Sequence, residues 1–284
     1  MKLSIGAWLV AALAIGGLVV IGWSLENHLL YFPTRALAST PASHGLPFED
    51  LSLATADGVR LRGWRIRGAG RGSAGRGSES RALLFFHGNA GNVGDRLDRA
   101  RILVQRLGLD VFLVDYRGYG ASEGSPSEDG LYRDARAIHR AARERGFAPE
   151  RIVVFGESLG SAVAVDLAGS EACAGLILET PFLSIAAMAR EHYPFVPGFL
   201  VRSRYDNAAK IASIRAPKLF LVAERDEVAP PDQGRRLYEL AAAPKTLYVI
   251  PGAGHNDTYA TGGETYWREW ERFLASLPRS QAPP

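Results

Sequence analysis

The segment Gly156-Glu157-Ser158-Leu159-Gly160 constrains this chain more than any other, because it follows the apolar run 151–155 and precedes a helix-forming stretch. A Gly-x-Ser-x-Gly sequence between a buried strand and a helix is typical of a turn sharp enough to expose its serine at the strand end. Free N–H groups at the start of the helix favour negative charge near that serine. Ser158 is therefore the candidate nucleophile, and the alternative is a glycine-rich turn with a purely structural role.

Short apolar runs alternate with helical patterns from residue 82 onward. We expect buried strands near 82–86, 111–114, 152–155, 176–178, 219–222 and 247–250, and helices near 95–107, 130–145, 159–168, 231–242 and 265–277. Apolar strands separated by helices indicate a mostly parallel sheet with helices on both faces. Asp57-Gly58, between two alternating segments, predicts an antiparallel hairpin ahead of that sheet. The fold class is therefore α/β, in which ligands bind beyond the carboxyl ends of the strands.

A base and an acid are expected to follow the serine along the chain. A serine hydroxyl becomes a strong nucleophile only when a base takes its proton, and in this architecture the order is Ser, acid, His. Asp226 lies just past the strand predicted at 219–222, and His255 lies just past the one at 247–250. We expect His255 to be the base and Asp226 to fix its tautomer. Glu179, after another predicted strand, is the alternative acid.

Acyl transfer also needs two backbone N–H groups aimed at the developing oxyanion. Leu159 supplies one directly after the serine. The second is expected from the loop His87-Gly88-Asn89, where a glycine after a strand lets the backbone turn an amide inward. Asn89 is the predicted donor. Three nearby acids are expected to have only local structural roles: Asp115, Glu157 and Asp257.

Composition narrows the possible partners. The net charge is only +3 and the cations are scattered along the chain, which argues against a nucleic-acid partner. The single cysteine, Cys173, excludes an internal disulfide framework, and no Cys/His cluster has metal-ligand spacing. Neither a metal nor a cofactor is expected. With 47% hydrophobic residues, the chain can form one large core.

The first residues differ in kind from the rest. Residues 3–23 carry no charge, and a helix of that length spans about 30 Å, which is the thickness of a bilayer core. A signal peptide would have an apolar region of about 7–15 residues followed by a small-residue cleavage site. Neither feature fits here, so we expect an uncleaved transmembrane anchor over 1–24. Lys2 ahead of the segment favours a translocated catalytic domain.

With these residues in position, the sequence resembles the α/β-hydrolase superfamily, and more narrowly its membrane-anchored branch related to serine aminopeptidase-like hydrolases. The stretches that carry the resemblance are 30–33, 87–92, 115–124, 156–160 and 254–257. The resemblance implies a triad of Ser158, Asp226 and His255, oxyanion amides at Asn89 and Leu159, and an N-terminal transmembrane helix. It does not select a substrate, because one fold serves many reactions.

The resemblance and the composition together suggest a division of the chain. We expect a tether over 25–48 and an α/β-hydrolase domain over 49–278. Within that domain, the glycine- and arginine-rich stretch 68–80 predicts a flexible loop that departs from the family pattern. The apolar stretch 182–206 predicts a small cap, with packing as the equal alternative. Residues 279–284 are expected to be a disordered tail.

These expectations converge on a membrane-anchored serine hydrolase that cleaves carboxylic esters or thioesters through an acyl-enzyme. Its partners would be the membrane and a small-molecule or lipid-like acyl substrate. An aminopeptidase-like serine peptidase on the same triad is the alternative. A non-catalytic membrane scaffold is the third hypothesis.

Overall fold

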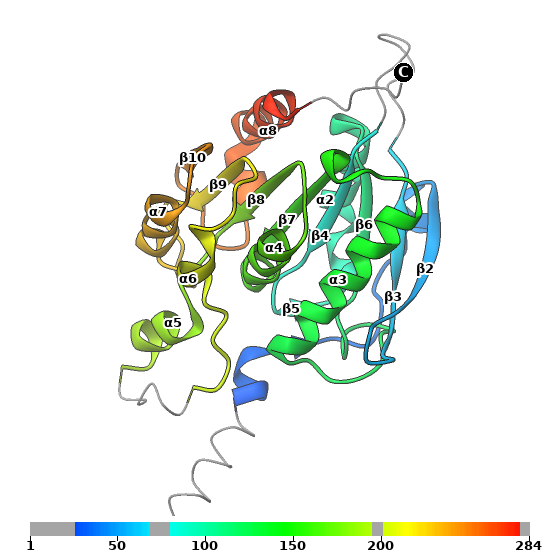
Figure 1. The fold of residues 1–284 in the computed structure, drawn as a ribbon, viewed down its shortest axis with the longest axis horizontal. Helices are drawn as coiled ribbons and strands as arrows, with labels where there is room; N and C mark the ends of the chain where they lie inside the picture. The colour runs from blue at the N-terminus through cyan, green and yellow to red at the C-terminus, as the bar shows by residue number, and fades with distance from the viewer. Residues whose placement is uncertain (1–25, 69–79, 195–200, 279–284) are drawn as a thin grey trace, which may run out of the picture.

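The computed structural model describes residues 26–68, 80–194 and 201–278, and its centre is an eight-stranded sheet (Figure 1). The strand order is β10-β9-β8-β7-β4-β6-β3-β2. The strands are β2 (Phe48–Ala54), β3 (Arg60–Ile66), β4 (Ala82–Phe86), β6 (Asp110–Val114), β7 (Ile152–Glu157), β8 (Gly175–Glu179), β9 (Lys218–Ala223) and β10 (Lys245–Ile250). Only the β2–β3 and β3–β6 pairs of this sheet are antiparallel. The predicted mostly parallel sheet is therefore confirmed.

Helices follow most of the parallel strands. They are α2 (Leu97–Leu107), α3 (Glu128–Glu144), α4 (Leu159–Ser170), α5 (Ile185–His192), α6 (Asn207–Ile211), α7 (Pro231–Leu240) and α8 (Thr258–Ser276). The last predicted helix, near 265–277, is confirmed as the part of α8 that follows a kink at Gly263, and a short helical segment that begins at Thr258 precedes the kink. Gly262 and Gly263 are adjacent in this helix, but only Gly263 leaves helical geometry, with φ 51°, and the chain is helical on both sides of it.

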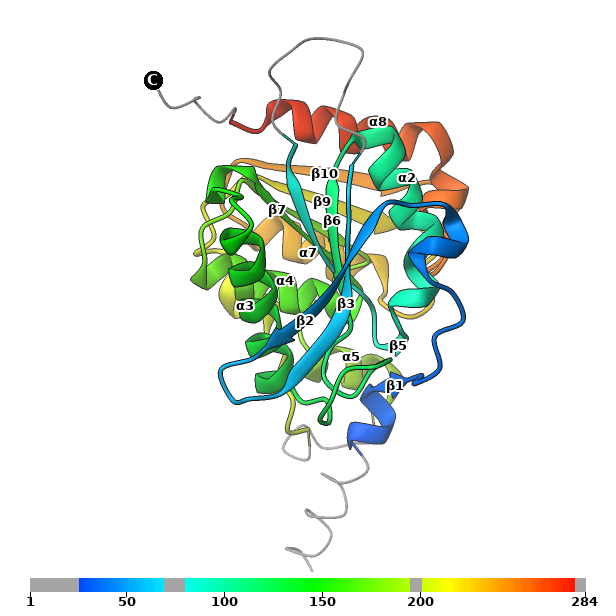
Figure 2. The ribbon, with the colours of Figure 1, turned by 90° about the vertical axis from the view of Figure 1, so that its right-hand side faces the viewer.

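The two faces of the sheet bury separate cores. Figure 2 shows α3 and α4 on one side of the sheet and α2 on the other. Successive strand residues point to opposite faces, so Val154 of β7 joins the core under α3 and α4, whereas Val153 and Phe155 join the core under α2 and α8. Strands buried on both sides need uninterrupted apolar sequence, which explains the runs that predicted them. The predicted helices on both faces are confirmed.

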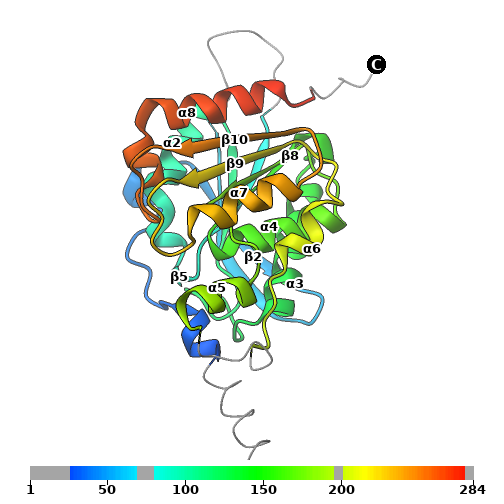
Figure 3. The same cartoon turned by 90° about the vertical axis from the view of Figure 1, so that its left-hand side faces the viewer.

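A second, two-stranded parallel sheet lies at the edge of the fold. It pairs β1 (Phe32–Pro33) with β5 (Ala90–Gly91). Residues 26–30 form a short helix ahead of β1, and this helix and α5 both lie at the lower end of the molecule in Figures 1 and 3. The N-terminal segment thereby reaches the loop after β4, where an oxyanion donor was predicted.

Several sequence predictions fall outside the described residues. They are the anchor over 1–24, most of the loop over 68–80, the middle of the cap over 182–206, and the tail over 279–284. Across the described ranges, every helix is too short or too polar to cross a bilayer.

Candidate active site

The turn between β7 and α4 holds Ser158 in a strained backbone conformation, with φ 51° and ψ −119°. Non-glycine residues in such regions cost on the order of 1–3 kcal/mol. The neighbouring glycines make the turn possible, because a Cβ on Gly156 would overlap the carbonyl oxygen of Gly160. A Cβ on Gly160 would in turn overlap the carbonyl oxygen of Phe86 in β4. Both glycines are therefore required by close backbone approach, and the turn pushes Ser158 out of the strand.

A chain of hydrogen bonds joins Ser158 to two distant side chains. His255 Nε2 lies 2.9 Å from Ser158 Oγ, and His255 Nδ1 lies 2.8 and 2.9 Å from the two carboxylate oxygens of Asp226. Because a carboxylate only accepts, Nδ1 carries the proton and Nε2 is left to accept from the serine hydroxyl. The structure therefore brings together the three side chains that the sequence singled out, from the ends of β7, β9 and β10.

The carboxylate of Asp226 is also fixed by its own loop. Oδ1 accepts the N–H groups of Val228 at 2.9 Å and Ala229 at 2.7 Å. The side chains of Asp226 and His255 are only 1% and 7% exposed, so few water molecules compete for these bonds. This arrangement keeps Asp226 directed at the imidazole and stabilises the imidazolium that proton transfer would create.

The two predicted oxyanion donors lie on either side of the serine turn. Leu159 is the first residue of α4, and the first N–H groups of a helix have no acceptor within the helix. On the other side, the loop after β4 passes close by, since a Cβ on Gly88 would lie 3.7 Å from Ser158 Cβ. Asn89 follows Gly88 in this loop.

Asn89 is held at several points. Its carbonyl oxygen accepts the N–H of Phe32 at 2.9 Å and the hydroxyl of Tyr119 at 2.8 Å. Its side-chain amide donates to the carbonyl oxygen of Leu30 at 3.0 Å. The N-terminal segment therefore braces the loop from which Asn89 is expected to present its N–H.

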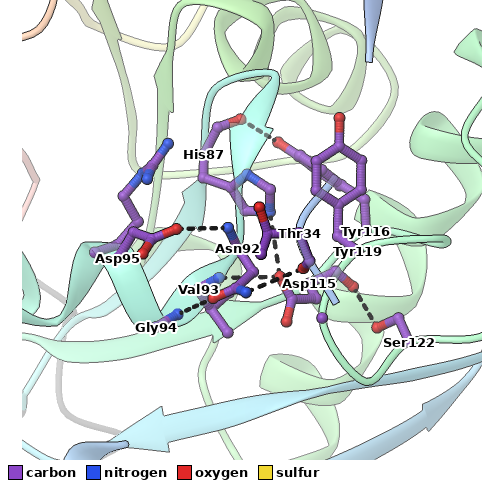
Figure 4. A network of polar contacts seen from close by, with 12 residues as sticks. Thr34, His87, Asn92, Val93, Gly94, Asp95, Asp115, Tyr116, Tyr119 and Ser122 are labelled. Atoms are coloured by element: carbon purple, nitrogen blue, oxygen red, sulfur yellow. Dashed lines mark hydrogen bonds and ion pairs between the residues drawn. The ribbon is translucent and has the colours of Figure 1, made fainter. Parts of the chain in front are cut away.

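His87 supports the same loop, and Figure 4 shows its ring above Asn92 and Asp115. Its Nδ1 lies 2.8 Å from the carbonyl oxygen of Gly88. Because a carbonyl oxygen only accepts, Nδ1 carries the proton. Burial, and then the charge of Arg96, lower the pKa of His87 to about 4, so the ring is neutral at physiological pH. Its Nε2 has no hydrogen-bond partner among the described residues and lies 3.7 Å from Asp115 Oδ1.

Asp115 is a second buried titratable group in this network (Figure 4). Burial raises its pKa to about 7, although the N–H of Val93 donates to Oδ1 at 3.0 Å and favours the charged form. Its backbone carbonyl accepts the hydroxyl of Ser122 at 2.8 Å. The neighbouring Tyr116 donates its hydroxyl to the carbonyl oxygen of His87 at 3.0 Å. These contacts fasten the end of β6 to the loop after β4.

Glu179, the alternative acid, has other partners. Its carboxylate accepts from Arg99 and Thr258, each at 2.6 Å, and from the hydroxyl of Tyr266. The contacts of His255 favour Asp226 instead. Glu179 thus holds α2 and α8 against the sheet rather than orienting the base.

Glu157, next to the candidate nucleophile, completes an ionic brace that sequence analysis missed. It accepts from Arg96 at 2.6 Å and from Arg99 at 2.8 Å, and it also accepts the N–H of Gly88 at 3.2 Å. Burial alone would raise the pKa of Glu157, but the charges of Arg96 and Arg99 lower it to about 2. The only sequence signal was the three-residue spacing of the two arginines at the start of α2, which does not reveal their partners.

Asp257, the third acid expected to be structural, contacts the loop that carries His255. Its Oδ1 accepts the N–H of Gly254 at 2.7 Å. In addition, Glu227 accepts the N–H of His255 at 3.3 Å. The backbone around His255 is therefore fixed by two carboxylates that do not contact its ring.

Comparisons with known proteins agree with this architecture. Residues 77–209 match the serine aminopeptidase S33 family. The chain is 38% identical over 288 residues to the α/β-hydrolase domain-containing protein WAV2 of Arabidopsis thaliana, covering 91% of this chain and 92% of that protein. It is 34% identical over 287 residues to an uncharacterised membrane protein of Saccharomyces cerevisiae, covering 94% of this chain and 97% of that protein.

A solved structure gives the same result for the fold. The esterase Pf2001 of Pyrococcus furiosus superposes with a TM-score of 0.71 at 20% identity, covering 87% of this chain and 99% of the esterase. At that identity the likeness concerns the fold alone. The Arabidopsis and yeast proteins, in contrast, are more than 30% identical to this chain and match it over more than 90% of its length and of theirs. The chain belongs to the α/β-hydrolase superfamily.

Proposed function

We propose that this protein is a membrane-anchored serine hydrolase that cleaves carboxylic esters or thioesters through an acyl-enzyme. Ser158 is the nucleophile, His255 is the general base and Asp226 orients the base. The observation that carries the proposal is the continuous set of contacts from Asp226 through His255 to Ser158 Oγ. Such contacts between a nucleophile, a base and an orienting acid are the geometric requirement for nucleophilic catalysis.

The hydrogen bonds from Ser158 to His255 and from His255 to Asp226 define the path of the proton during acylation. As Ser158 Oγ attacks the carbonyl carbon, its proton passes to His255 Nε2, which already lies 2.9 Å away. Asp226 accepts from Nδ1 and stabilises the imidazolium without being protonated. His255 then gives the proton to the departing alcohol or thiol. Water repeats the sequence on the acyl-enzyme, and it releases the carboxylic acid and restores Ser158.

The N–H groups of Asn89 and Leu159 are proposed to bind the oxyanion in both steps. A single donor of this kind contributes about 10²–10³ in kcat. Support for this assignment comes from the position of Leu159 at the start of α4 and from the fixed backbone of Asn89.

An N-terminal anchor is proposed over residues 1–24, with the catalytic domain on the translocated side. Its support is the uncharged sequence of residues 3–23 and the name of the yeast relative, which describes a membrane protein. Resistance of the full chain to alkaline extraction from membranes tests the anchor. Protease protection of the catalytic domain in sealed vesicles tests its orientation.

An aminopeptidase-like activity is the second candidate. It is favoured by one observation, the match of residues 77–209 to a family named for a serine aminopeptidase. The same triad would then attack a peptide carbonyl. Rates on aminoacyl amides, short-chain esters and thioesters distinguish the two reactions, because only a peptidase prefers the amides.

Covalent labelling by a fluorophosphonate probe tests the shared mechanism. We expect the wild-type protein to be labelled and Ser158→Ala to be unlabelled, since the probe requires an activated serine. Gly169→Ala, in the same helix but away from the turn, serves as the folded control. Equal labelling of wild type and Ser158→Ala, or none in folded wild type, would overturn the proposal and favour a scaffold.

A further inference from the structure

Exposed apolar side chains gather around the candidate site. Among the described residues, the exposed large hydrophobic side chains are Leu29, Phe32, Leu37, Tyr193, Val228 and Leu240. Leu29 is 64% exposed and Phe32 is 50% exposed. A single exposed apolar side chain is ordinary, whereas several in one region mark an interaction surface. Four of these side chains belong to segments that contact the loop of Asn89 or the loop of Asp226, and they define the apolar rim: Leu29, Phe32, Tyr193 and Val228.

Two members of the apolar rim lie beside the oxyanion loop. Phe32 pairs with Ala90 between β1 and β5, and its N–H donates to the carbonyl oxygen of Asn89 at 2.9 Å. Leu29 is in the short helix that leads into β1. Their exposed side chains are therefore next to the backbone that faces Ser158.

The other two members lie beside the acid. The N–H of Val228 donates to Asp226 at 2.9 Å, and its carbonyl oxygen lies 2.7 Å from His192 Nε2. Tyr193 follows His192 at the end of α5, and the two rings meet edge to face. The apolar rim therefore borders the site on both the oxyanion side and the acid side.

The N-terminal segment is fastened to the segment after α5. The carboxylate of Glu26 accepts the N–H groups of Arg202 at 2.8 Å and Ser203 at 2.6 Å. The hydroxyls of Tyr31 and Tyr205 are 2.8 Å apart, and both are buried. The two sides of the apolar rim are thus held together, and the short helix over residues 26–30 lies at the same end of the molecule as α5 (Figure 3).

The position of residue 26 selects a lipid surface as the partner of the apolar rim. The uncharged stretch 3–23 ends a few residues earlier in the sequence. From residue 23 to residue 29, even a fully extended chain reaches only about 20 Å. If residues 3–23 lie in a bilayer, Leu29 is therefore held close to that bilayer, together with the rest of the rim. A soluble partner would have to displace the lipid from this position.

We propose that the apolar rim docks on the membrane surface and that the site takes esters dissolved in the bilayer, whose acyl chains enter between the two sides of the rim. This inference rests on the proposed function, because the bond that is cleaved is the one Ser158 attacks. It adds a substrate class, which is water-insoluble acyl esters or thioesters presented by a membrane.

Docking is tested first without catalysis. Full-length protein in phosphatidylcholine vesicles is labelled with an environment-sensitive fluorophore at Leu29→Cys or Tyr193→Cys, each in a Cys173→Ser background. We expect quenching by lipid-borne nitroxides at both positions. The matched control is Leu240→Cys, because Leu240 ends α7 just before the start of β10, whereas the candidate site lies beyond the carboxyl ends of the parallel strands. Equal quenching at all three positions would overturn docking on lipid. Quenching at residues 29 and 193 that changes with the protein-to-lipid ratio would also overturn it, because it would indicate that copies of the protein cover these positions.

Turnover is tested next with two substrates. The double variant Leu29→Ser/Tyr193→Ser is compared with Leu240→Ser on a soluble butyrate ester and on a long-chain ester embedded in the same vesicles. We expect the double variant to lose at least tenfold on the embedded ester and to stay within twofold on the soluble one. An equal loss on both substrates, or the same loss in Leu240→Ser, would contradict the inference.

The two proposals fail in different ways. If wild-type protein hydrolyses neither ester while residues 29 and 193 are quenched by lipid, docking holds and the proposed hydrolase activity fails, together with the substrate class. If the soluble ester is hydrolysed but residues 29 and 193 are not quenched, the hydrolase stands and membrane docking fails.

Discussion

The Nδ1 atom of His87 lies 2.8 Å from the carbonyl oxygen of Gly88, and that carbonyl belongs to the same planar peptide as the N–H of Asn89. A hydrogen bond to one end of a rigid peptide fixes the direction of the other end. His87 is therefore in a position to orient a proposed oxyanion donor without touching substrate. It does so from a site that is 0% exposed, where water does not compete for the bond.

Replacing His87 by leucine removes this donor at similar volume. We expect kcat to fall about 10²-fold with a small change in KM, because the Asn89 N–H is mispositioned mainly for the transition state. His87→Asn retains an N–H donor near the position of Nδ1, and we expect it to recover at least half of the loss on a logarithmic scale. If both variants lose activity only in proportion to their loss of folded protein, the role of His87 is purely structural.

Asp226 is the proposed orienting acid and Glu179 is a structural acid, so variants of the two residues should differ in what they lose. Asp226→Asn should lower kcat about 10⁴-fold with little effect on unfolding, because the amide favours the wrong histidine tautomer. Glu179→Gln should instead reduce the free energy of unfolding by about 2–3 kcal/mol, since it weakens charged hydrogen bonds to buried Arg99. Steady-state kinetics and urea unfolding of both variants check this. Reversed effects would make Glu179 the orienting acid.

Two glycines of α4 provide a matched pair for the serine turn. In Gly160→Ala the new methyl group would collide with the backbone of β4, so we expect a loss of at least about 3 kcal/mol in unfolding free energy or no folded protein. In Gly169→Ala nothing lies within 4 Å of the new methyl group, so a gain of about 0.5–1 kcal/mol from helix propensity is expected. Urea unfolding of the two variants measures the difference. Similar stabilities would contradict the close approach at Gly160.

Asp115 should make stability depend on pH. Its pKa rises from 3.8 to about 7 on folding, so the folded state binds the proton more tightly than the unfolded state. The stabilisation that Asp115 adds to the free energy of unfolding is fully present below about pH 4 and is lost as the pH rises to 7. At 1.36 kcal/mol per pKa unit, the loss is about 4 kcal/mol. Asp115→Asn should therefore gain stability relative to wild type as the pH rises through this interval.

The measurement for Asp115 is urea unfolding of both proteins between pH 4.5 and pH 8. His87 acts in the opposite sense, because its pKa is lowered from 6.5 to about 4 and its contribution is lost as the pH falls. Because His87 lies 3.7 Å from Asp115, the two groups are coupled at low pH. Above about pH 6.5 His87 is largely neutral in both the folded and the unfolded state, so the comparison from there to pH 8 isolates Asp115. A difference in stability that is constant with pH would show that Asp115 is ionised throughout.

Local sequence patterns were sufficient for the serine turn and for the strands around it. The pattern of Gly156 to Gly160 depends on backbone crowding within one turn, and buried parallel strands must be apolar along their whole length. Chain order then pointed to Asp226 and His255, because each follows a strand whose carboxyl end lies at the same edge of the sheet. These features depend on neighbours close in sequence, or on a topology that the alternation of strands and helices implies.

Only the tertiary structure decided which partners the buried charges take. Arg99 bridges Glu157 and Glu179, residues that lie 58 and 80 positions away along the chain. The pairing of β1 with β5 brings the N-terminal segment beside Asn89, and the apolar rim joins Leu29 to Val228 around one site. The physical reason is that periodicity records which side of an element is buried, whereas the partner on that side depends on how the distant elements pack.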